Sequence, residues 1–380
     1  MGNFYVRGAL ALPVLLAAWA GVALVNAQDA GASPKAGTLF VQGGELVFQA
    51  GTGTVNGVSL NIGGSLVQFR DSDAPVTLDP ARAGTCTQVD AHTVDCDPFT
   101  LKVRVDLQDG NDYFTGIGNA VVFGGDGDDH LDGGFAPGTN TIFGGAGKDT
   151  IKGGLGRDVI HAGPGDDTVE GLDGNDVLFG DAGKDEIRGG DGDDRIDGGA
   201  DRDDVYGGDG KDDLRSVQGD DNQYGGPDND TLGSGIDVLG EAGDDRVVMG
   251  QNGGEYWGGQ GNDVIDYSEW GHEVHVSLDG NDNDGGKNAD CDDWIGCPVT
   301  ERHNVHGDFE HVIGTPYDDK ISGNNNPENL DGGAGSDRLY GNGGNDYLDA
   351  ESGANQRTDG GTGFDTCVGF DIVARPGCDA

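Results

Sequence analysis

Aspartate recurs at a fixed spacing through the middle of the chain. From residue 144 the sequence divides into ten consecutive units of nine residues, from GGAGKDTIK to GGPDNDTLG, without insertion or deletion. Glycine favours positions one, two and four, aspartate occupies position six in all ten units, and an aliphatic residue occupies position eight in nine, Gln223 being the exception. Related units lie at 124–132, 240–248, 258–266, 332–340 and 341–349. A disordered low-complexity chain does not hold such a phase, so the period indicates a repeated fold.

The units resemble the RTX family of haemolysin-type nonapeptide repeats, GGxGxDxUx. The resemblance covers about half of the chain that follows the N-terminal segment. It implies an all-β fold, a right-handed parallel β-roll in which two units make one turn, with calcium ions held in the loops. Stacked loops on one edge would then come from alternate units. Asp149, Asp167 and Asp185 would line one edge, and Asp158, Asp176 and Asp194 the other.

The residue types support that expectation independently. A short segment such as TIK or RID can form a strand whose central aliphatic residue faces inward, while GGxGxD forms the turn. Glycines permit positive φ angles that aim several carbonyls at one point. Ca²⁺ takes about six to eight oxygen ligands, which carbonyls and carboxylates supply. The candidate calcium ligands are the position-six aspartates Asp129, Asp149, Asp158, Asp167, Asp176, Asp185, Asp194, Asp203, Asp212, Asp221, Asp230, Asp245, Asp263, Asp337 and Asp346.

Energetics favour folding coupled to metal binding. One buried aliphatic residue per unit stabilises the fold by about 2 kcal/mol. Ordering nine residues costs about 1 kcal/mol or more for each residue in backbone entropy. We therefore expect a chain that is largely disordered without Ca²⁺ and β-rich with it. The alternative is an acidic solenoid that needs no metal.

The charge balance excludes several partners. Lys and Arg number 22 against 69 Asp and Glu, a formal net charge of −47. Nucleic acids and anionic membrane surfaces require basic patches, so neither is expected to bind. Cations are the expected partners.

The N-terminus resembles a secretory signal. Arg7 precedes an apolar run at 9–25, and Val25-Asn26-Ala27 resembles a small-residue cleavage site. This pattern predicts that residues 1–27 are removed. The mature protein is then expected to be secreted to the extracellular space and to have no membrane span. An uncleaved membrane anchor is the alternative.

The six cysteines suit an oxidising compartment. Their closeness in sequence predicts the disulfides Cys86–Cys96, Cys291–Cys297 and Cys367–Cys378. Their spacing does not suit zinc.

Composition divides the rest of the chain. Alternating apolar residues at 36–112 predict a small β domain that caps the roll. The segment 267–313 interrupts the array and resembles linkers between RTX blocks. DGND at 109–112 resembles a degenerate first turn, and whether the acidic loop at 279–297 holds its own ion is left open. The expected regions are a β cap at 36–112, the roll at 113–266, an insertion with a disulfide-pinned loop at 267–313, a second repeat block at 314–366 and a disulfide cap at 367–380.

No catalytic constellation is recognisable. His272-Glu273-Val274-His275 resembles part of HExxH, but Val276 stands where the second histidine is needed and the context is a strand. No G-x-S-x-G nucleophile motif occurs. We therefore expect a calcium-binding repeat protein rather than an enzyme. The alternative is a calcium-dependent adhesin or matrix protein, with Trp270 and Trp294 exposed on the insertion to bind a cell-surface or glycan ligand. Threonine is too scattered for an ice-binding row.

Overall fold

The computed structural model describes residues 36–379 apart from 44, 54, 64–65, 98–101, 117, 216–218, 251–253, 279–284, 287–302, 354–355 and 370–376. Residues 34–380 form one compact unit. The described part of the chain contains strands and no helix, and so no helix long and apolar enough to cross a bilayer. The predicted signal segment, the disulfide Cys291–Cys297 and the loop at 279–297, apart from 285–286, lie outside the described residues.

The first strands pair mainly in an antiparallel manner. β1 pairs with β2, β3 with β4, and β4 with β7. Apolar residues alternate along them, so Leu39, Phe48, Leu60 and Phe69 point to one core and are at most 1% exposed. The strands of this region are β1 (Gly37–Gln42), β2 (Glu45–Gln49), β3 (Gly57–Gly63), β4 (Leu66–Asp71), β5 (Val76–Leu78), β6 (Thr87–Gln88), β7 (Thr93–Cys96) and β8 (Lys102–Asp106).

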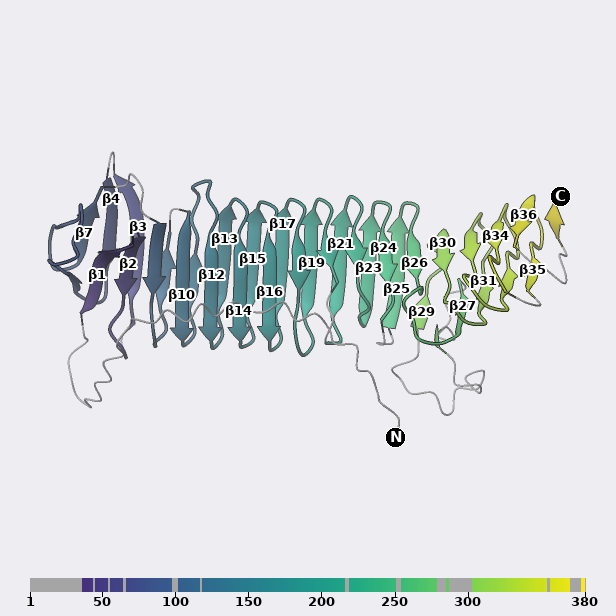
Figure 1. Cartoon of the computed structure of the whole chain (residues 1–380), viewed down its shortest axis with the longest axis horizontal. Coiled ribbons are helices and arrows are strands. Elements are labelled where there is room, and N and C mark those ends of the chain that lie inside the picture. Colours follow the sequence, from purple (N-terminus) through teal and green to yellow (C-terminus); the bar gives the residue numbers. More distant parts are fainter. Residues whose placement is uncertain are drawn as a thin grey trace, which may run out of the picture. The chain divides into compact units, whose positions relative to one another are not determined.

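The repeat units form two parallel sheets, with successive strands assigned to alternate sheets (Figure 1). Sheet A continues from β8 with β10 (Ala120–Asp126), β12 (Thr141–Ala146), β14 (Val159–Pro164), β16 (Val177–Ala182), β18 (Arg195–Asp197), β20 (Asp213–Leu214), β22 (Thr231–Leu232), β24 (Arg246–Val248) and β26 (Val264–Asp266). Sheet B continues from β3 with β9 (Tyr113–Thr115), β11 (His130–Asp132), β13 (Thr150–Leu155), β15 (Thr168–Asp173), β17 (Glu186–Asp191), β19 (Asp204–Asp209), β21 (Asn222–Pro227), β23 (Asp237–Ala242) and β25 (Gly254–Gln260).

One residue per strand builds the core between the sheets. Ile142 pairs with Ile160 and Ile160 with Leu178 in sheet A, while Ile151 pairs with Val169 in sheet B. All five side chains are fully buried. The predicted all-β, parallel β-roll is confirmed. Position eight faces inward because successive side chains of a strand point to opposite faces.

Gln223 also takes the inward position, where it is fully buried. Its Oε1 accepts a hydrogen bond from the Gly233 N–H at 2.9 Å, and its Nε2 lies 3.4 Å from the Ser234 carbonyl. These bonds compensate for burying an amide among aliphatic side chains.

The two sheets continue across the interruption of the repeat. β26 pairs directly with β30 (His311–Ile313), and β25 pairs with β29 (His303–Val305). Beyond it, sheet A adds β32 (Asn329–Asp331), β34 (Tyr347–Asp349), β36 (Asp365–Val368) and β37 (Cys378–Asp379). A third sheet, sheet C, faces them with β27 (Val274–Ser277), β28 (Gly285–Gly286), β31 (Lys320–Ser322), β33 (Arg338–Tyr340) and β35 (Arg357–Asp359).

Two predicted disulfides are present, and one expectation about a side chain is wrong. Cys86 bonds to Cys96, and Cys367 bonds to Cys378. Trp270, expected to be exposed, is only 7% exposed. It packs edge-on against His303, because the chain folds back there onto the end of sheet B. Trp294 lies outside the described residues.

Candidate metal centres

Glycine allows the loops of the roll to stack closely. At position two, Gly145 has a φ of 118°, and a Cβ there would lie 1.9 Å from the Gly125 carbonyl oxygen of the preceding turn. At position four, Gly147 has a φ of 133°, and its Cβ would lie 2.1 Å from the Gly127 carbonyl oxygen. Any side chain at these positions would meet backbone in a conformation that L-residues rarely adopt. The glycines thus bring carbonyl oxygens of successive turns together.

The position-six residues form three rows along the roll. At nearly every step of a row the side chain of one turn accepts a hydrogen bond from the backbone N–H of the position-six residue one turn earlier. The exception is Glu310, whose N–H donates to the Asp263 carbonyl and which is stacked next to Glu328 by the pairing of β30 with β32. The Asp149 N–H donates to Asp167 Oδ1 at 2.7 Å, and the Asp158 N–H donates to Asp176 Oδ1 at 2.7 Å. These bonds place alternate units on the same edge, as the sequence predicted.

The three rows include every candidate ligand from the sequence. Row A, on the loops that enter sheet A, is Asn140, Asp158, Asp176, Asp194, Asp212, Asp230, Asp245, Asp263, Glu310, Glu328, Asp346 and Asp365. Row B, entering sheet B, is Asp112, Asp129, Asp149, Asp167, Asp185, Asp203 and Asp221. Row C, entering sheet C, holds Asp319 and Asp337. All fifteen predicted aspartates are at most 3% exposed.

The second carboxylate oxygen of these aspartates is buried and lacks a hydrogen-bond donor within the described residues. A buried acceptor without a donor is costly, and a native fold rarely repeats that arrangement without a reason. The oxygens concerned are Oδ2 of Asp129, Asp149, Asp158, Asp167, Asp176, Asp185, Asp194, Asp203, Asp212, Asp230, Asp245, Asp263, Asp337 and Asp346.

A carbonyl oxygen of the next turn faces most of these carboxylates across a small gap. The position-one glycine marks this gap, because a Cβ on Gly144 would lie 2.5 Å from Asp149 Oδ2 and 2.4 Å from the Ala162 carbonyl oxygen. A Cβ on Gly171 would lie 2.5 Å from both Asp176 Oδ2 and the Gly189 carbonyl oxygen. Neither oxygen of such a pair can donate a hydrogen bond when the carboxylate is ionised. The gap therefore suits a cation.

Asn140 shows what happens when a donor is present at the same place. Its Nδ2 donates to the Gly153 carbonyl oxygen at 2.9 Å, and Gly153 stands at position one of the next turn. The carbonyl therefore does accept a hydrogen bond when an amide replaces the carboxylate. In the aspartate turns an ion would have to take the place of that N–H.

The donor set favours a hard, oxygen-seeking ion. Among the described residues no group of three or more His, Cys, Asp or Glu side chains converges as a metal site. Most ligands would therefore be backbone carbonyls, joined by one carboxylate oxygen from each loop. That mixture suits Ca²⁺ and does not suit Zn²⁺.

Burial raises the pKa of these carboxyls from an ordinary 3.8. Desolvation is the largest cause, and neighbouring aspartates of the same row add to it. The pKa of Asp185 rises to about 8 and that of Asp129 to about 7, although an N–H bond from the preceding turn lowers each in part. The pKa of Asp149 rises to about 6. The metal-free roll thus disfavours the charged form that a cation needs.

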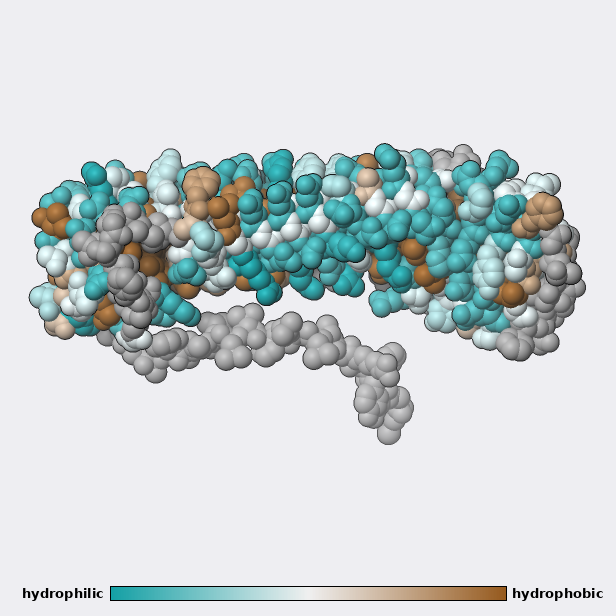
Figure 2. Space-filling model, turned by 90° about the horizontal axis from the view of Figure 1, so that it is seen from above, coloured by the Kyte–Doolittle hydropathy of each residue, from teal (hydrophilic) through white to brown (hydrophobic). Residues whose placement is uncertain are grey.

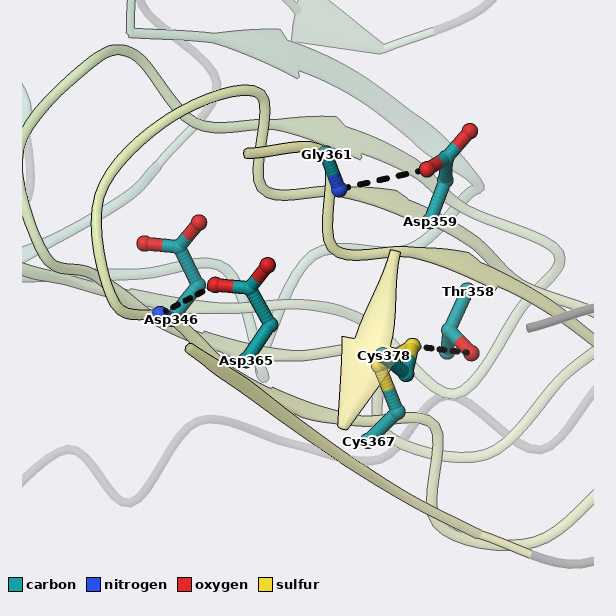
Figure 3. Close-up of a disulfide and its surroundings, with 7 residues drawn as sticks. All are labelled: Asp346, Thr358, Asp359, Gly361, Asp365, Cys367 and Cys378. Atoms are coloured by element: carbon teal, nitrogen blue, oxygen red, sulfur yellow. Dashed lines mark hydrogen bonds between the residues drawn. A yellow bond between two sulfur atoms is a disulfide. The ribbon is translucent and has the colours of Figure 1, made fainter. Parts of the chain in front are cut away.

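The rows extend beyond the predicted ligands. Asp112 and Asp365 each have a buried Oδ2 without a donor in the described structure, and Glu328 has a similar Oε2. DGND at 109–112 and GGTGFD at 360–365 carried the repeat signal for the first two. Figure 3 shows the last link of row A, where the Asp346 N–H donates to Asp365 Oδ1 beside the disulfide Cys367–Cys378.

Asp319 differs from the other acids in its surroundings. Its Oδ2 accepts from the Thr315 N–H at 2.6 Å and the Thr315 hydroxyl at 2.9 Å, while its Oδ1 accepts from the Val274 N–H at 2.7 Å. Protein donors therefore satisfy both oxygens. His272 and His275 lie outside the rows: His275 is in strand β27, which the sequence predicted there, and His272 precedes that strand.

Surface aspartates are separate from the rows. Asp193 and Asp204 are exposed, whereas the adjacent Asp194 and Asp203 are buried. The face in Figure 2 is accordingly hydrophilic along most of the repeat region.

Comparison with known proteins agrees with the repeat. A family model for four copies of the RTX calcium-binding nonapeptide repeat matches residues 136–169, 161–195, 170–205, 179–214 and 322–356. No curated protein matches the chain. The matched segments contain part of each row, including Asp158 to Asp212 of row A, Asp149 to Asp203 of row B and Asp337 of row C.

Proposed function

Because this chain carries RTX calcium-binding nonapeptide repeats on a parallel β-roll, we propose that it is a secreted calcium-binding protein whose roll folds when Ca²⁺ enters the gaps of its rows. The observation that carries the proposal is the repeated pairing of a buried Oδ2 with a carbonyl oxygen of the next turn, without a donor between them. The proposed ligands are the fifteen position-six aspartates predicted from the sequence, together with Asp112 and Asp365.

The electrostatics of the rows support coupling between ion and fold. Each row stacks buried carboxyls in successive turns, and their mutual repulsion opposes closure of the roll. When bound, Ca²⁺ would supply positive charge and coordination between one carboxylate and the carbonyls of the adjacent turn. The aliphatic core contributes one inward side chain per strand, too little to offset the backbone entropy of the loops.

Secretion is the second part of the proposal. The two disulfides suit an oxidising compartment. Extracellular modules bind Ca²⁺ at about 10⁻⁴ to 10⁻³ M, far above what a cytosol supplies. The chain would stay open inside the cell and close outside it.

We propose a structural role without catalysis. The buried acids of the rows are arranged as repeated, equivalent oxygen pairs rather than as one site with distinct acid, base and nucleophile. Their burial also leaves no access for a substrate.

The test is a calcium titration of residues 28–380, followed by circular dichroism and calorimetry. We expect β structure to appear as Ca²⁺ replaces EGTA, with several ions bound per chain. A matched pair of variants locates the sites. Asp176→Ala removes a row carboxylate and should lower the calcium stoichiometry, whereas Asp191→Ala removes an exposed carboxylate of the next turn and should not. An unchanged spectrum, or one ion or none per chain, would overturn the proposal.

A further inference from the structure

Row A begins at a buried asparagine, and a second buried asparagine lies directly ahead of row B. Asn140 is the first residue of row A and is fully buried. Its Oδ1 accepts from the Ala120 N–H at 3.1 Å, its N–H donates to Asp158 Oδ1 at 2.5 Å, and its Nδ2 donates to the Gly153 carbonyl at 2.9 Å. The side chain thus joins three successive turns with protein groups alone.

Asn56 occupies the equivalent place ahead of row B. Parallel pairing of Gly57 with Tyr113 sets Asn56 beside Asp112, the first acid of that row. The Asn56 N–H donates to Asp112 Oδ1 at 2.6 Å, and Nδ2 reaches the same oxygen at 3.0 Å and the Leu107 carbonyl at 3.4 Å. Leu107 stands at position one of its unit, as Gly153 does in the other row. Asn56 is also fully buried.

The amide differs from a carboxylate in one decisive way. Asparagine Nδ2 carries two N–H donors, so it can bond the facing carbonyl oxygen directly. An N–H group pointing into the gap also repels a cation. In an aspartate turn this gap holds two hydrogen-bond acceptors and no donor. In the turns of Asn56 and Asn140 an amide N–H bonds the carbonyl oxygen, so no ion is needed there.

We propose that Asn56 and Asn140 are metal-free links that set the N-terminal limit of the calcium-dependent roll. The strands before them would stay folded without calcium and offer a fixed edge onto which the calcium-dependent turns stack. This inference rests on the proposed function.

The strands before Asn56 and Asn140 contain a packed apolar core and a disulfide, which can stabilise them without calcium. Phe48 and Phe69 pack with ring centroids 4.6 Å apart, and Leu39 and Leu60 share their core. The disulfide Cys86–Cys96 crosslinks the same region. This core is denser in large apolar side chains than the repeat turns, where each strand contributes one.

The test exchanges amide and acid between adjacent turns of row A. Asn140→Asp replaces the amide that bonds the Gly153 carbonyl by a carboxylate, so this gap then holds two acceptors. Asp158→Asn places an N–H donor in the next gap. That gap lies between residue 158 and the Gly171 carbonyl, because a Cβ on Gly153 would lie 2.8 Å from Asp158 Oδ2 and 2.7 Å from the Gly171 carbonyl oxygen. Hydrogen exchange of residues 28–380 is followed in EGTA and in Ca²⁺, and calcium stoichiometry is measured for each variant. The two substitutions are matched in size and opposite in chemistry.

In EGTA the wild type should protect β1–β8 and β10 and leave the turns from β14 onward unprotected. Asn140→Asp should lose protection of β10 in EGTA and bind more calcium than the wild type. Asp158→Asn should bind less calcium and extend the EGTA-protected region to β14. Equal stoichiometry and equal protection in wild type and both variants would overturn the links while leaving calcium binding intact. A wild type that binds no calcium would instead overturn the proposed function.

Discussion

The strands that precede the repeats and the repeat turns offset the entropy cost of folding in different ways. Between β1 and β8, antiparallel strands bury Leu39, Phe48, Leu60 and Phe69 around a disulfide. Between β12 and β26, nearly every strand buries one aliphatic residue in the core, and most loops of rows A and B bury a carboxyl oxygen for which the described structure offers no donor. The first region is stabilised by side-chain packing. The second depends on something that the polypeptide itself does not supply.

Calcium removal should have the largest effect and should divide the two regions. In EGTA, limited proteolysis of residues 28–380 should cut within 150–266 and spare a fragment that spans the disulfide Cys86–Cys96, because only the roll depends on ions. Mass spectrometry identifies the fragments, and excess Ca²⁺ should restore resistance. Equal digestion of both regions would contradict the comparison.

Acidification should act in opposite directions with and without calcium. The folded, metal-free roll raises the pKa of Asp185 and Asp230 to about 8 and that of Asp149 to about 6, above the ordinary 3.8 of an unfolded chain. Between about pH 4 and 8 the folded roll therefore binds more protons than the unfolded chain, and its stability falls as pH rises. Circular dichroism in EGTA should show more β structure at pH 4.5 than at pH 8.

The calcium-loaded roll should show the reverse dependence. Ligand carboxylates must be ionised, so acidification through the same range should release Ca²⁺. A metal-free roll that gains structure as pH rises would show that the buried carboxyls do not control folding.

Core truncations should separate the regions by their dependence on calcium. Phe48→Ala should lower the free energy of unfolding by about 3–5 kcal/mol in both EGTA and Ca²⁺, because its core needs no ion. Ile160→Ala should cost about 2–5 kcal/mol in Ca²⁺ and change nothing measurable in EGTA, where its turn is already open. Denaturant unfolding in the two buffers measures both. A loss for Phe48→Ala confined to Ca²⁺ would show that the first region also depends on the ion.

Removing a disulfide should have a smaller effect. Replacing Cys86 and Cys96 by alanine should lower the stability of the first region by about 2–4 kcal/mol, since the bond constrains the unfolded chain. Thermal unfolding in EGTA isolates that region. The matched replacement of Cys367 and Cys378 should leave this EGTA transition unchanged, because those cysteines lie at the other end of the repeats.

The smallest effect concerns a surface stack on sheet B. Tyr206 and Tyr224 stack with ring centroids 4.8 Å apart and an angle of 8° between the planes. Tyr224→Ala should lower the stability of the calcium-loaded roll by about 0.5–1.5 kcal/mol. Tyr347→Ala, at an exposed tyrosine of the second repeat block, is the control and should change it less.

The nine-residue period, together with its resemblance to RTX repeats, predicted the roll and most residues of its rows. The resemblance implies two units per turn, so Asp149 and Asp158 were expected on opposite edges. The same reasoning could have added Asp112 and Asp365, whose units are recognisable. It could not place Glu310, because 47 residues separate it from Asp263, the residue whose N–H it accepts in the folded chain.

Other features depend on contacts that a one-dimensional pattern does not encode. Asn140 lies in a stretch that departs from the nonapeptide, and its importance lies in the direction of one N–H bond to Gly153. Trp270 sits in an acidic, irregular segment that suggests exposure, yet the fold packs it against His303. The predicted boundaries of the regions likewise remain a prediction, since strand pairing runs from β8 to β10 without a break.

The hydrogen bonds within row A join residues that are neighbours in space but lie at different separations along the chain. The donor and acceptor residues are 18 apart at Asp245 and Asp263, 15 apart at Asp230 and Asp245, and 47 apart at Asp263 and Glu310. A turn can thus be shortened or enlarged at the opposite edge while the row keeps its spacing. Foreign loops grafted there should be displayed without disturbing the row, which makes this chain a natural scaffold for insertion.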